Sequence, residues 1–382
     1  MKQQTGEYVM KNAAVGILII ALLQLATPAQ SLRDVFGKYF KIGASLNSAQ
    51  FSGRDARGEA IIKTHFNTIS PENILKWESV HPLDGKYDFE GSDKYVAFGE
   101  KNKMFIVGHT LVWHNQTPKW VFEDASGKPV TREVLLERLR DHISAVVGRY
   151  KGRIHGWDVV NEALNEDGTL RQSQWFKIIG PDYIAKAFQF AHDADPKAEL
   201  YYNDYSLENA AKRKGAIELV RNLQKQGVKV AAVGSQSHHK MDWPSMEEQD
   251  RTITELAALG VKVAITELDI DVLPRASDYR GADISVNYEL QTRVNPFKNG
   301  LPDARQKELA DRYGAIFKIF MKHHKVIDRV TFWCVTDADS WLNDWPVRGR
   351  TNYPLLWDRE GKPKPAFWQI IKTVEESKSS EQ

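Results

Sequence analysis

Eight short apolar segments, rich in β-branched residues, recur along the chain and alternate with segments of helical spacing. They cover residues 38–47, 65–73, 104–113, 154–162, 198–205, 230–238, 261–269 and 327–335. Short runs of this kind are typical of strands that are buried on both faces of a parallel sheet. Parallel neighbours need long crossover connections, which are usually helices. The alternation therefore predicts an α/β fold made of repeated strand–helix units.

Helical periodicity fills the gaps between these segments. In residues 131–151, Leu139, Ile143 and Val146 belong to one apolar stripe. In residues 245–260, Ser245 and Glu248 form a capping-box pattern and Gly260 marks the end. Further helices are expected near 92–103, 182–194, 210–226, 303–325 and 364–377.

This order of elements favours a (β/α)₈ TIM barrel that forms a single domain. A doubly wound open sheet is the alternative fold. It is less consistent with the sequence, because no GxGxxG turn follows an early strand.

Both ends of the chain fall outside the barrel pattern. Residues 13–26 form an apolar run behind a polar start with Lys2 and Lys11, and small residues follow as far as Ala29. The run is shorter than the roughly 20 residues of a membrane span, so it predicts a cleaved signal peptide over 1–29. A buried N-terminal helix is the alternative. We expect the catalytic barrel over 30–375 and a disordered tail over 376–382. We expect the mature chain to be exported, to the periplasm or beyond the cell, without a membrane anchor.

Composition narrows the classes of function. Lys and Arg number 52 against 50 Asp and Glu, a balance that argues against a nucleic-acid-binding protein. Cys334 is the single cysteine, which excludes an intramolecular disulfide framework and a Cys-rich zinc site. The 11 Trp residues can serve either as core or as a surface on which a ligand stacks. We expect a monomer without a cofactor.

Polar or aromatic residues end seven of the eight predicted strands, where simple turn residues would suffice for structure. In barrel enzymes the carboxyl ends of the strands build the active site, so the pattern predicts a functional cleft there. The polar segment from Asp271 to Gly300 follows the seventh strand and should overhang the same face. The residues at the strand ends are Glu72, Asn73, His109, Trp113, His114, Asn161, Glu162, Asn203, Asp204, Tyr205, Gln236, Ser237, His238, Glu267, Asp269 and Trp333, with Lys76 and Trp77 just beyond the second strand.

Two of these residues, Glu162 and Glu267, end the fourth and seventh strands. Paired carboxylates suit the cleavage of glycosides, in which one protonates the leaving oxygen and the other attacks the anomeric carbon. Asp269 shares a strand face with Glu267, and His238 ends the neighbouring strand. A carboxylate–imidazole–carboxylate chain through His238 would keep Glu267 ionised, as a nucleophile requires. A salt bridge at the barrel rim is the structural alternative for either glutamate.

The surroundings of the two glutamates suit a sugar. The amide of Asn161 can hold a hydroxyl, and Trp113, Tyr205, Trp333 and Trp341 offer rings for stacking. The histidines suggest an alternative function, that of a metal-dependent barrel hydrolase, which would use His109, His114, His238 and His239. The His-x-His and His-Glu-x-x-His spacings of such sites do not occur in the sequence, so we expect no metal site.

A set of motifs in fixed order resembles glycoside hydrolase family 10, the endo-1,4-β-xylanases, over residues 33–374. The resemblance implies a barrel enzyme that cleaves internal β-1,4 bonds of xylan and xylo-oligosaccharides by double displacement. The motifs are 70–78 (SPENILKWE), 108–114 (GHTLVWH), 157–162 (WDVVNE), 202–205 (YNDY), 234–238 (GSQSH) and 265–269 (ITELD), with the Trp333 strand and the closing segment 354–365.

Matched position by position, the resemblance implies that Glu162 is the general acid/base and Glu267 the nucleophile, with His238 and Asp269 in support of Glu267. Tyr205 matches an aromatic nearer the aglycone side, and the long 271–300 loop departs from a minimal member of the family. Positions that bind sugar on the glycone side are matched by Glu72, Asn73, Lys76, His109, Trp113, Asn161, Gln236, Trp333 and Trp341. The alternatives are a non-catalytic secreted carbohydrate-binding protein, or the same chemistry directed at β-glucans.

Overall fold

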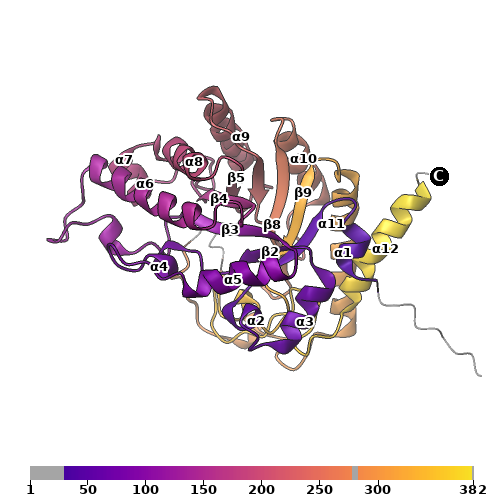
Figure 1. Cartoon of the computed structure of the whole chain (residues 1–382). Coiled ribbons are helices and arrows are strands. Elements are labelled where there is room, and N and C mark those ends of the chain that lie inside the picture. Colours follow the sequence, from indigo (N-terminus) through magenta and orange to yellow (C-terminus); the bar gives the residue numbers. More distant parts are fainter. Residues whose placement is uncertain (1–29, 278–282, 381–382) are drawn as a thin grey trace, which may run out of the picture. The chain divides into compact units, whose positions relative to one another are not determined.

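Eight parallel strands close into a barrel in the computed structural model, which describes residues 30–277 and 283–380 (Figure 1). Strand β1 pairs with both β2 and β9, and β6 pairs with β8, so the hydrogen-bonded ladder returns to its start. The predicted TIM barrel is therefore confirmed. The barrel strands are β1 (Lys41–Leu46), β2 (Thr68–Pro71), β3 (Phe105–Val112), β4 (Gly156–Asn161), β5 (Glu199–Asp204), β6 (Ala232–Ser235), β8 (Lys262–Asp271) and β9 (Ile327–Phe332).

A long helix follows each barrel strand. All are predicted by helical spacing except α3, whose ten residues bury only Gly58, Ile61 and Ile62 and so leave a weak apolar stripe. The helices are α3 (Ala56–His65), α5 (Glu90–Lys101), α6 (Arg132–Arg149), α8 (Tyr183–Ala194), α9 (Ala210–Lys225), α10 (Met246–Ala257), α11 (Asp303–Lys322) and α12 (Pro365–Ser380). Shorter elements are α1 (Leu32–Phe36), α2 (Ser48–Phe51), α4 (Trp77–Val80), α7 (Gln174–Ile179), η1 (Lys119–Val121), η2 (Thr292–Val294) and η3 (Trp341–Asn343).

Half of the predicted capping box is present at α10. The side chain of Ser245 accepts a hydrogen bond from the backbone N–H of Glu248 at 3.2 Å, as an N-cap residue should. The side chain of Glu248 pairs instead with Arg213 and Arg251. The start of the helix is thus set by Ser245, while Glu248 ties it to α9.

The sixth predicted strand, 230–238, is divided in two. Strand β6 ends at Ser235, Ser237 adopts a positive φ of 60°, and a short strand β7 (His238–Lys240) begins after it. Strand β7 pairs with the outer part of β8, with His238 opposite Asp269 and Lys240 opposite Asp271. We call residues 238–240 and 269–271 the ledge, because they extend the sheet beyond the β6–β8 pairing of the barrel.

The ends of the chain are only partly described. The predicted signal peptide, residues 1–29, lies outside the described residues. Helix α12 continues to Ser380, so residues 376–380 of the expected tail are helical, and Glu376 pairs there with Lys318 of α11. No helix within the described part of the chain combines the length and apolar character needed to cross a membrane.

The contact between β3 and β4 leaves no room for a side chain at Gly108. Gly108 is paired with Trp157, whose indole is fully buried. A Cβ atom at residue 108 would lie 2.1 Å from Cε3 of that indole. A buried ring cannot move aside easily in a close-packed interior. Glycine at residue 108 therefore allows β3 and β4 to pair at this point, directly before the pair formed by His109 and Asp158.

We predict that Gly108→Ala lowers the free energy of unfolding by about 1–3 kcal/mol, the usual cost of overpacking a core. Gly148→Ala is the matched control, because a Cβ atom there meets nothing within 4 Å on the surface of α6. The control should leave stability unchanged or raise it by about 0.5–1 kcal/mol. Urea unfolding followed by circular dichroism measures both. Equal stability of the two variants would contradict the account of the β3–β4 contact.

Candidate active site

A cleft of about 660 Å³ opens at the carboxyl ends of the barrel strands. The residues to which the sequence assigns catalytic, supporting or sugar-binding roles all line it, whereas the strand-end residues His114, Asn203, Asp204 and Ser237 do not. The backbone is strained at its floor, since Glu162, Ser206, Ser237 and Cys334 have positive φ values of 52–82° at or just after the ends of β4, β5, β6 and β9. Such strain in non-glycine residues persists only where the surroundings hold it, and it gathers at functional sites.

Glu162 follows β4 and is 7% exposed. Three donors converge on its carboxylate: Trp113 Nε1 on Oε2 at 2.9 Å, and Gln236 Nε2 and Asn161 Nδ2 on Oε1 at 2.9 and 3.3 Å. Its backbone N–H donates to the carbonyl of Asn203 at 2.9 Å. The side chain is therefore fixed in direction, and the donors can stabilise the carboxylate that remains after it gives up a proton.

Glu267 lies in β8 and is 5% exposed. Its Oε2 lies 3.2 Å from His238 Nε2, and its Oε1 accepts a hydrogen bond from Asn203 Nδ2 at 2.9 Å. Burial raises the pKa of Glu267, but the hydrogen bond from His238 and the charges of His109 and His238 outweigh it and lower the pKa overall. Glu267 is therefore held as an anion.

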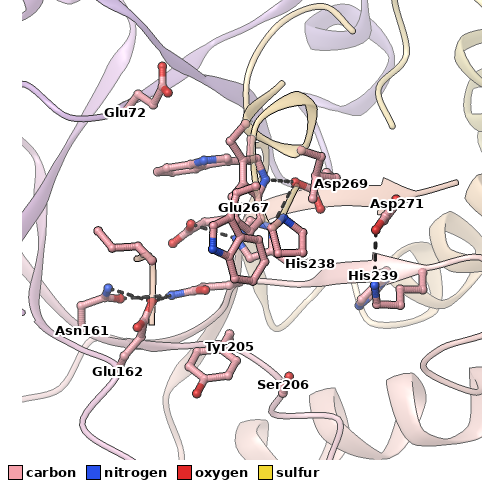
Figure 2. A pocket seen from close by; sticks show the side chains of 18 of the residues that line it. Glu72, Asn161, Glu162, Tyr205, Ser206, His238, His239, Glu267, Asp269 and Asp271 are labelled. Atoms are coloured by element: carbon pink, nitrogen blue, oxygen red, sulfur yellow. Dashed lines mark hydrogen bonds and ion pairs between the residues drawn. The ribbon is translucent and has the colours of Figure 1, made fainter. Parts of the chain in front are cut away.

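His238 joins Glu267 to Asp269 in the predicted three-membered chain (Figure 2). Its Nδ1 lies 3.1 Å from Asp269 Oδ2. Burial lowers the pKa of His238, but the two carboxylates raise it to about 10. The ring is thus a cation at neutral pH, and both nitrogens carry a proton. Asp269 accepts a further hydrogen bond from Trp341 Nε1 at 2.7 Å.

Asn203, near the end of β5, links the two halves of the site; the sequence places it at a strand end but assigns it no role. Its Nδ2 donates both to Glu267 and to Asn161 Oδ1, each at 2.9 Å, and Thr266 Oγ1 donates to its Oδ1 at 2.7 Å. Asn161 in turn contacts Glu162. The signal for Asn203 was its place at a strand end, but a buried amide there has many structural uses, so position alone did not single it out.

A second cluster of polar side chains lies beyond β2, around the buried ammonium of Lys76. Lys76 Nζ donates to Asn73 Oδ1 at 3.0 Å and to Gln116 Oε1 at 2.9 Å, and lies 4.8 Å from the centre of the Trp113 ring. Burial lowers the pKa of Lys76, opposed by the charges of Glu267, Glu72 and Glu162. Gln116 was also missed, since it lies in the loop after β3 rather than at a strand end.

The tryptophans of the cleft differ in their exposure to solvent. Trp113 and Trp333 are 9% and 7% exposed, and His109 lies edge-on to Trp333 at 5.6 Å. Trp341 is partly exposed and stacks on Trp345 at 4.9 Å. Tyr205 accepts a hydrogen bond from Arg171 at 3.1 Å. Trp113 has a task that the sequence did not suggest, because its indole N–H orients Glu162.

The 271–300 loop overhangs the cleft, as predicted. Its backbone is fastened to the segment after β9: Tyr288 N–H donates to the carbonyl of Pro346 at 2.8 Å, and the Tyr353 hydroxyl donates to that of Phe297 at 2.7 Å. Residues 278–282 lie outside the described part. The loop residues that line the cleft are Arg275, Ala276, Ser277, Ile284 and Tyr288.

The histidines proposed for a metal site are used elsewhere. His109 pairs with Asp158 at 2.9 Å, His238 with the carboxylates, and His239 with Glu208 at 3.5 Å. The fourth, His114, does not line the cleft, and its Nε2 lies 3.2 Å from Asn115 Nδ2. Among residues 30–277 and 283–380, no group of three or more His, Cys, Asp or Glu side chains is arranged to hold a metal ion.

Comparisons with known proteins agree with this geometry. A model of glycosyl hydrolase family 10 matches residues 31–373. Endo-1,4-beta-xylanase A of Xylanibacter ruminicola is 48% identical over 361 residues, covering 94% of this chain and 98% of that protein.

Solved structures are similar as well. A GH10 endoxylanase from a sugarcane soil metagenome superposes with a TM-score of 0.87 at 47% identity, covering 90% of this chain and 99% of that chain. A mutant in complex with xylotriose superposes with a TM-score of 0.81 at 36% identity, covering 90% and 99%. The family match spans nearly the whole described barrel. The chain therefore belongs to glycosyl hydrolase family 10.

Proposed function

We propose that the protein is an endo-1,4-β-xylanase that hydrolyses internal β-1,4 bonds of xylan with retention of anomeric configuration. Glu267 attacks the anomeric carbon while Glu162 gives its proton to the departing oxygen. Glu162 then takes a proton from water, which attacks the glycosyl–Glu267 ester. The two inversions together leave the β configuration in the product.

The observation that carries this proposal is the unequal surroundings of the two glutamates. Glu267 faces the His238 cation, which favours a permanent anion and hence a nucleophile. Glu162 has only neutral donors on its carboxylate, from Trp113, Gln236 and Asn161. Neutral donors allow a group to give up and regain a proton, as an acid/base must in the two steps.

The cleft suits a neutral polysaccharide. It is open enough to admit a chain, and it combines partly exposed rings at Trp341 and Trp345 with polar groups at Glu72, Asn73 and Lys76. Relatives named as xylanases, and a related structure that holds xylotriose, support xylan as the substrate. Release of reducing sugar from xylan, with cellulose and mixed-linkage glucan in parallel, tests this choice. A faster rate on a β-glucan, or none on any of them, would overturn it.

We also propose that residues 1–29 direct export and are then removed, and that the mature enzyme is a monomer. The apolar run over 13–26 and the small residues before Gln30 support the first part. The N-terminal sequence and native mass of the protein recovered from the periplasm or medium test both parts. An intact N-terminus would contradict the removal, and a larger native mass would contradict the monomer.

Glu162→Ala should lower kcat/KM on xylan by about 10²–10⁴-fold, the usual contribution of a general acid/base. The loss should be much smaller for formation of the glycosyl-enzyme from an aryl xylobioside with an activated leaving group, because that group needs no proton. Added azide should raise turnover of the variant by attacking the xylobiosyl-enzyme, and should give a β-xylobiosyl azide. Glu162→Gln, which keeps the shape of the side chain, should show the same difference between the two substrates. Equal losses on both substrates would contradict the role of Glu162 as an acid.

His238→Gln should move the acidic limb of the kcat/KM profile to higher pH. The variant keeps a hydrogen-bonding group beside Glu267 but removes the cation that lowers its pKa. Glu267 would then be protonated, and unable to attack, at a higher pH than in the wild type. Rates on an aryl xylobioside between pH 3 and 8 measure the limb. An unchanged limb would rule out the cation as the cause of the lowered pKa.

The same histidine should make stability depend on pH. Folding raises the pKa of His238 from 6.5 to about 10, because the two carboxylates outweigh burial. Its stabilisation is therefore complete below about pH 6.5 and is lost as the pH rises through about 10. The difference in unfolding free energy between wild type and His238→Gln should shrink across this range. A difference that stays constant, measured by urea unfolding, would contradict the assignment.

A further inference from the structure

Glu208 is a buried carboxylate between β5 and α9, and it does not line the cleft. It is 2% exposed. Ser235 Oγ donates to its Oε1 at 2.9 Å, Ser237 Oγ approaches the same oxygen at 3.5 Å, and His239 Nε2 lies 3.5 Å away. Three alternate residues of one segment thus converge on a single oxygen atom.

The residues between them point the other way. Gln236 Nε2 donates to Glu162 Oε1 at 2.9 Å. His238 Nε2 lies 3.2 Å from Glu267 Oε2 (Figure 2). Segment 235–239 therefore contacts Glu208 with one face and both proposed catalytic glutamates with the other. A displacement of its backbone would move Gln236 and His238 together.

The segment needs an anchor because its backbone is not a regular strand. Ser237 has a φ of 60°, and the pairing of β6 stops at Ser235 before that of β7 begins at His238. Strained residues keep their conformation only where their surroundings impose it. Backbone bonds hold Gln236 itself, from its N–H to Asp204 and from Glu267 N–H to its carbonyl. On the face of the segment opposite Gln236 and His238, the side chains of Ser235, Ser237 and His239 contact Glu208.

Charge favours the same role. Burial raises the pKa of Glu208, but the contact with His239 and the hydrogen bond from Ser235 outweigh it and lower the pKa overall. An ionised carboxylate accepts stronger hydrogen bonds than a neutral acid or amide. The strength of the hydrogen bonds between Glu208 and segment 235–239 therefore depends on the charge of Glu208 as well as on its shape.

We propose that Glu208 is a positioning residue for catalysis, which holds segment 235–239 so that Gln236 reaches Glu162 and His238 reaches Glu267. The inference rests on the proposed function, since it assumes that these two glutamates carry out the reaction. A buried carboxylate that only stabilises the fold is the alternative, and it predicts a loss of stability without an effect on the chemistry of the folded enzyme.

Glu208→Gln tests the inference, with Asp195→Asn as the matched control. Asp195 is also 2% exposed and also holds backbone, accepting from Gly152 N–H at 2.9 Å, but it lies beyond the end of α8 and does not line the cleft. In folded Glu208→Gln, kcat on an aryl xylobioside should fall by about 10–100-fold, as small displacements of catalytic groups do. KM should change little, and the acidic limb of kcat/KM should move to higher pH as His238 loosens from Glu267. The control should lose stability without either change.

Two further measurements keep the test decisive. Ser235→Ala removes the shortest contact of the Glu208 carboxylate. It should cause a smaller loss of kcat, and the acidic limb of kcat/KM should again move to higher pH. This variant provides the test if Glu208→Gln does not fold. A folded Glu208→Gln or Ser235→Ala enzyme with wild-type kcat and an unmoved acidic limb would overturn the positioning role. Wild-type enzyme inactive on xylan would instead overturn the proposed function.

Discussion

Closure of the sheet through the pairing of β6 with β8 is the constraint on which the site depends. With both of its edges joined, the parallel sheet presents eight carboxyl ends at one rim. Residues far apart in the sequence, such as Glu162 and Glu267, then enter one cleft without any direct contact between their own strands. The ledge formed by β7 and the outer part of β8 extends the sheet beyond the barrel and places His238 beside Asp269.

The electrostatics of the cleft follow from the charged and neutral side chains that the strand ends place there. The ledge supplies a cation between two carboxylates, so Glu267 stays ionised in spite of its burial. The ends of β4 and β6 supply neutral amides, so Glu162 is oriented without a permanent counter-charge. Asn203 donates hydrogen bonds to Asn161 and to Glu267, and so fixes the surroundings of the two glutamates relative to each other. One fold thus gives two identical side chains different surroundings, on which their proposed roles depend.

Much of this arrangement could be predicted from the sequence, for physical reasons. Buried parallel strands leave a strong apolar signal, and polar residues such as Glu162 and Glu267 stand out where that signal ends. The weak stripe of α3 and the break at Ser237 escaped prediction, because few buried residues mark the former and a serine gives no warning of a positive φ. No role could be assigned from the sequence to Asn203 or Gln116 in the site or to Glu208 behind it, because each acts through partners that only the folded chain brings within reach.

Covalent trapping of the nucleophile tests the central claim most directly. A 2-fluoro-xylobioside with an activated leaving group slows both steps, the second more, so the glycosyl-enzyme should accumulate as inactivation proceeds. Mass spectrometry of the intact protein and of its peptides would locate the label. We predict one sugar per chain, attached to Glu267, with activity recovered when the ester turns over. Attachment at another residue, or turnover of substrate to the α-anomer without any covalent adduct, would contradict the account.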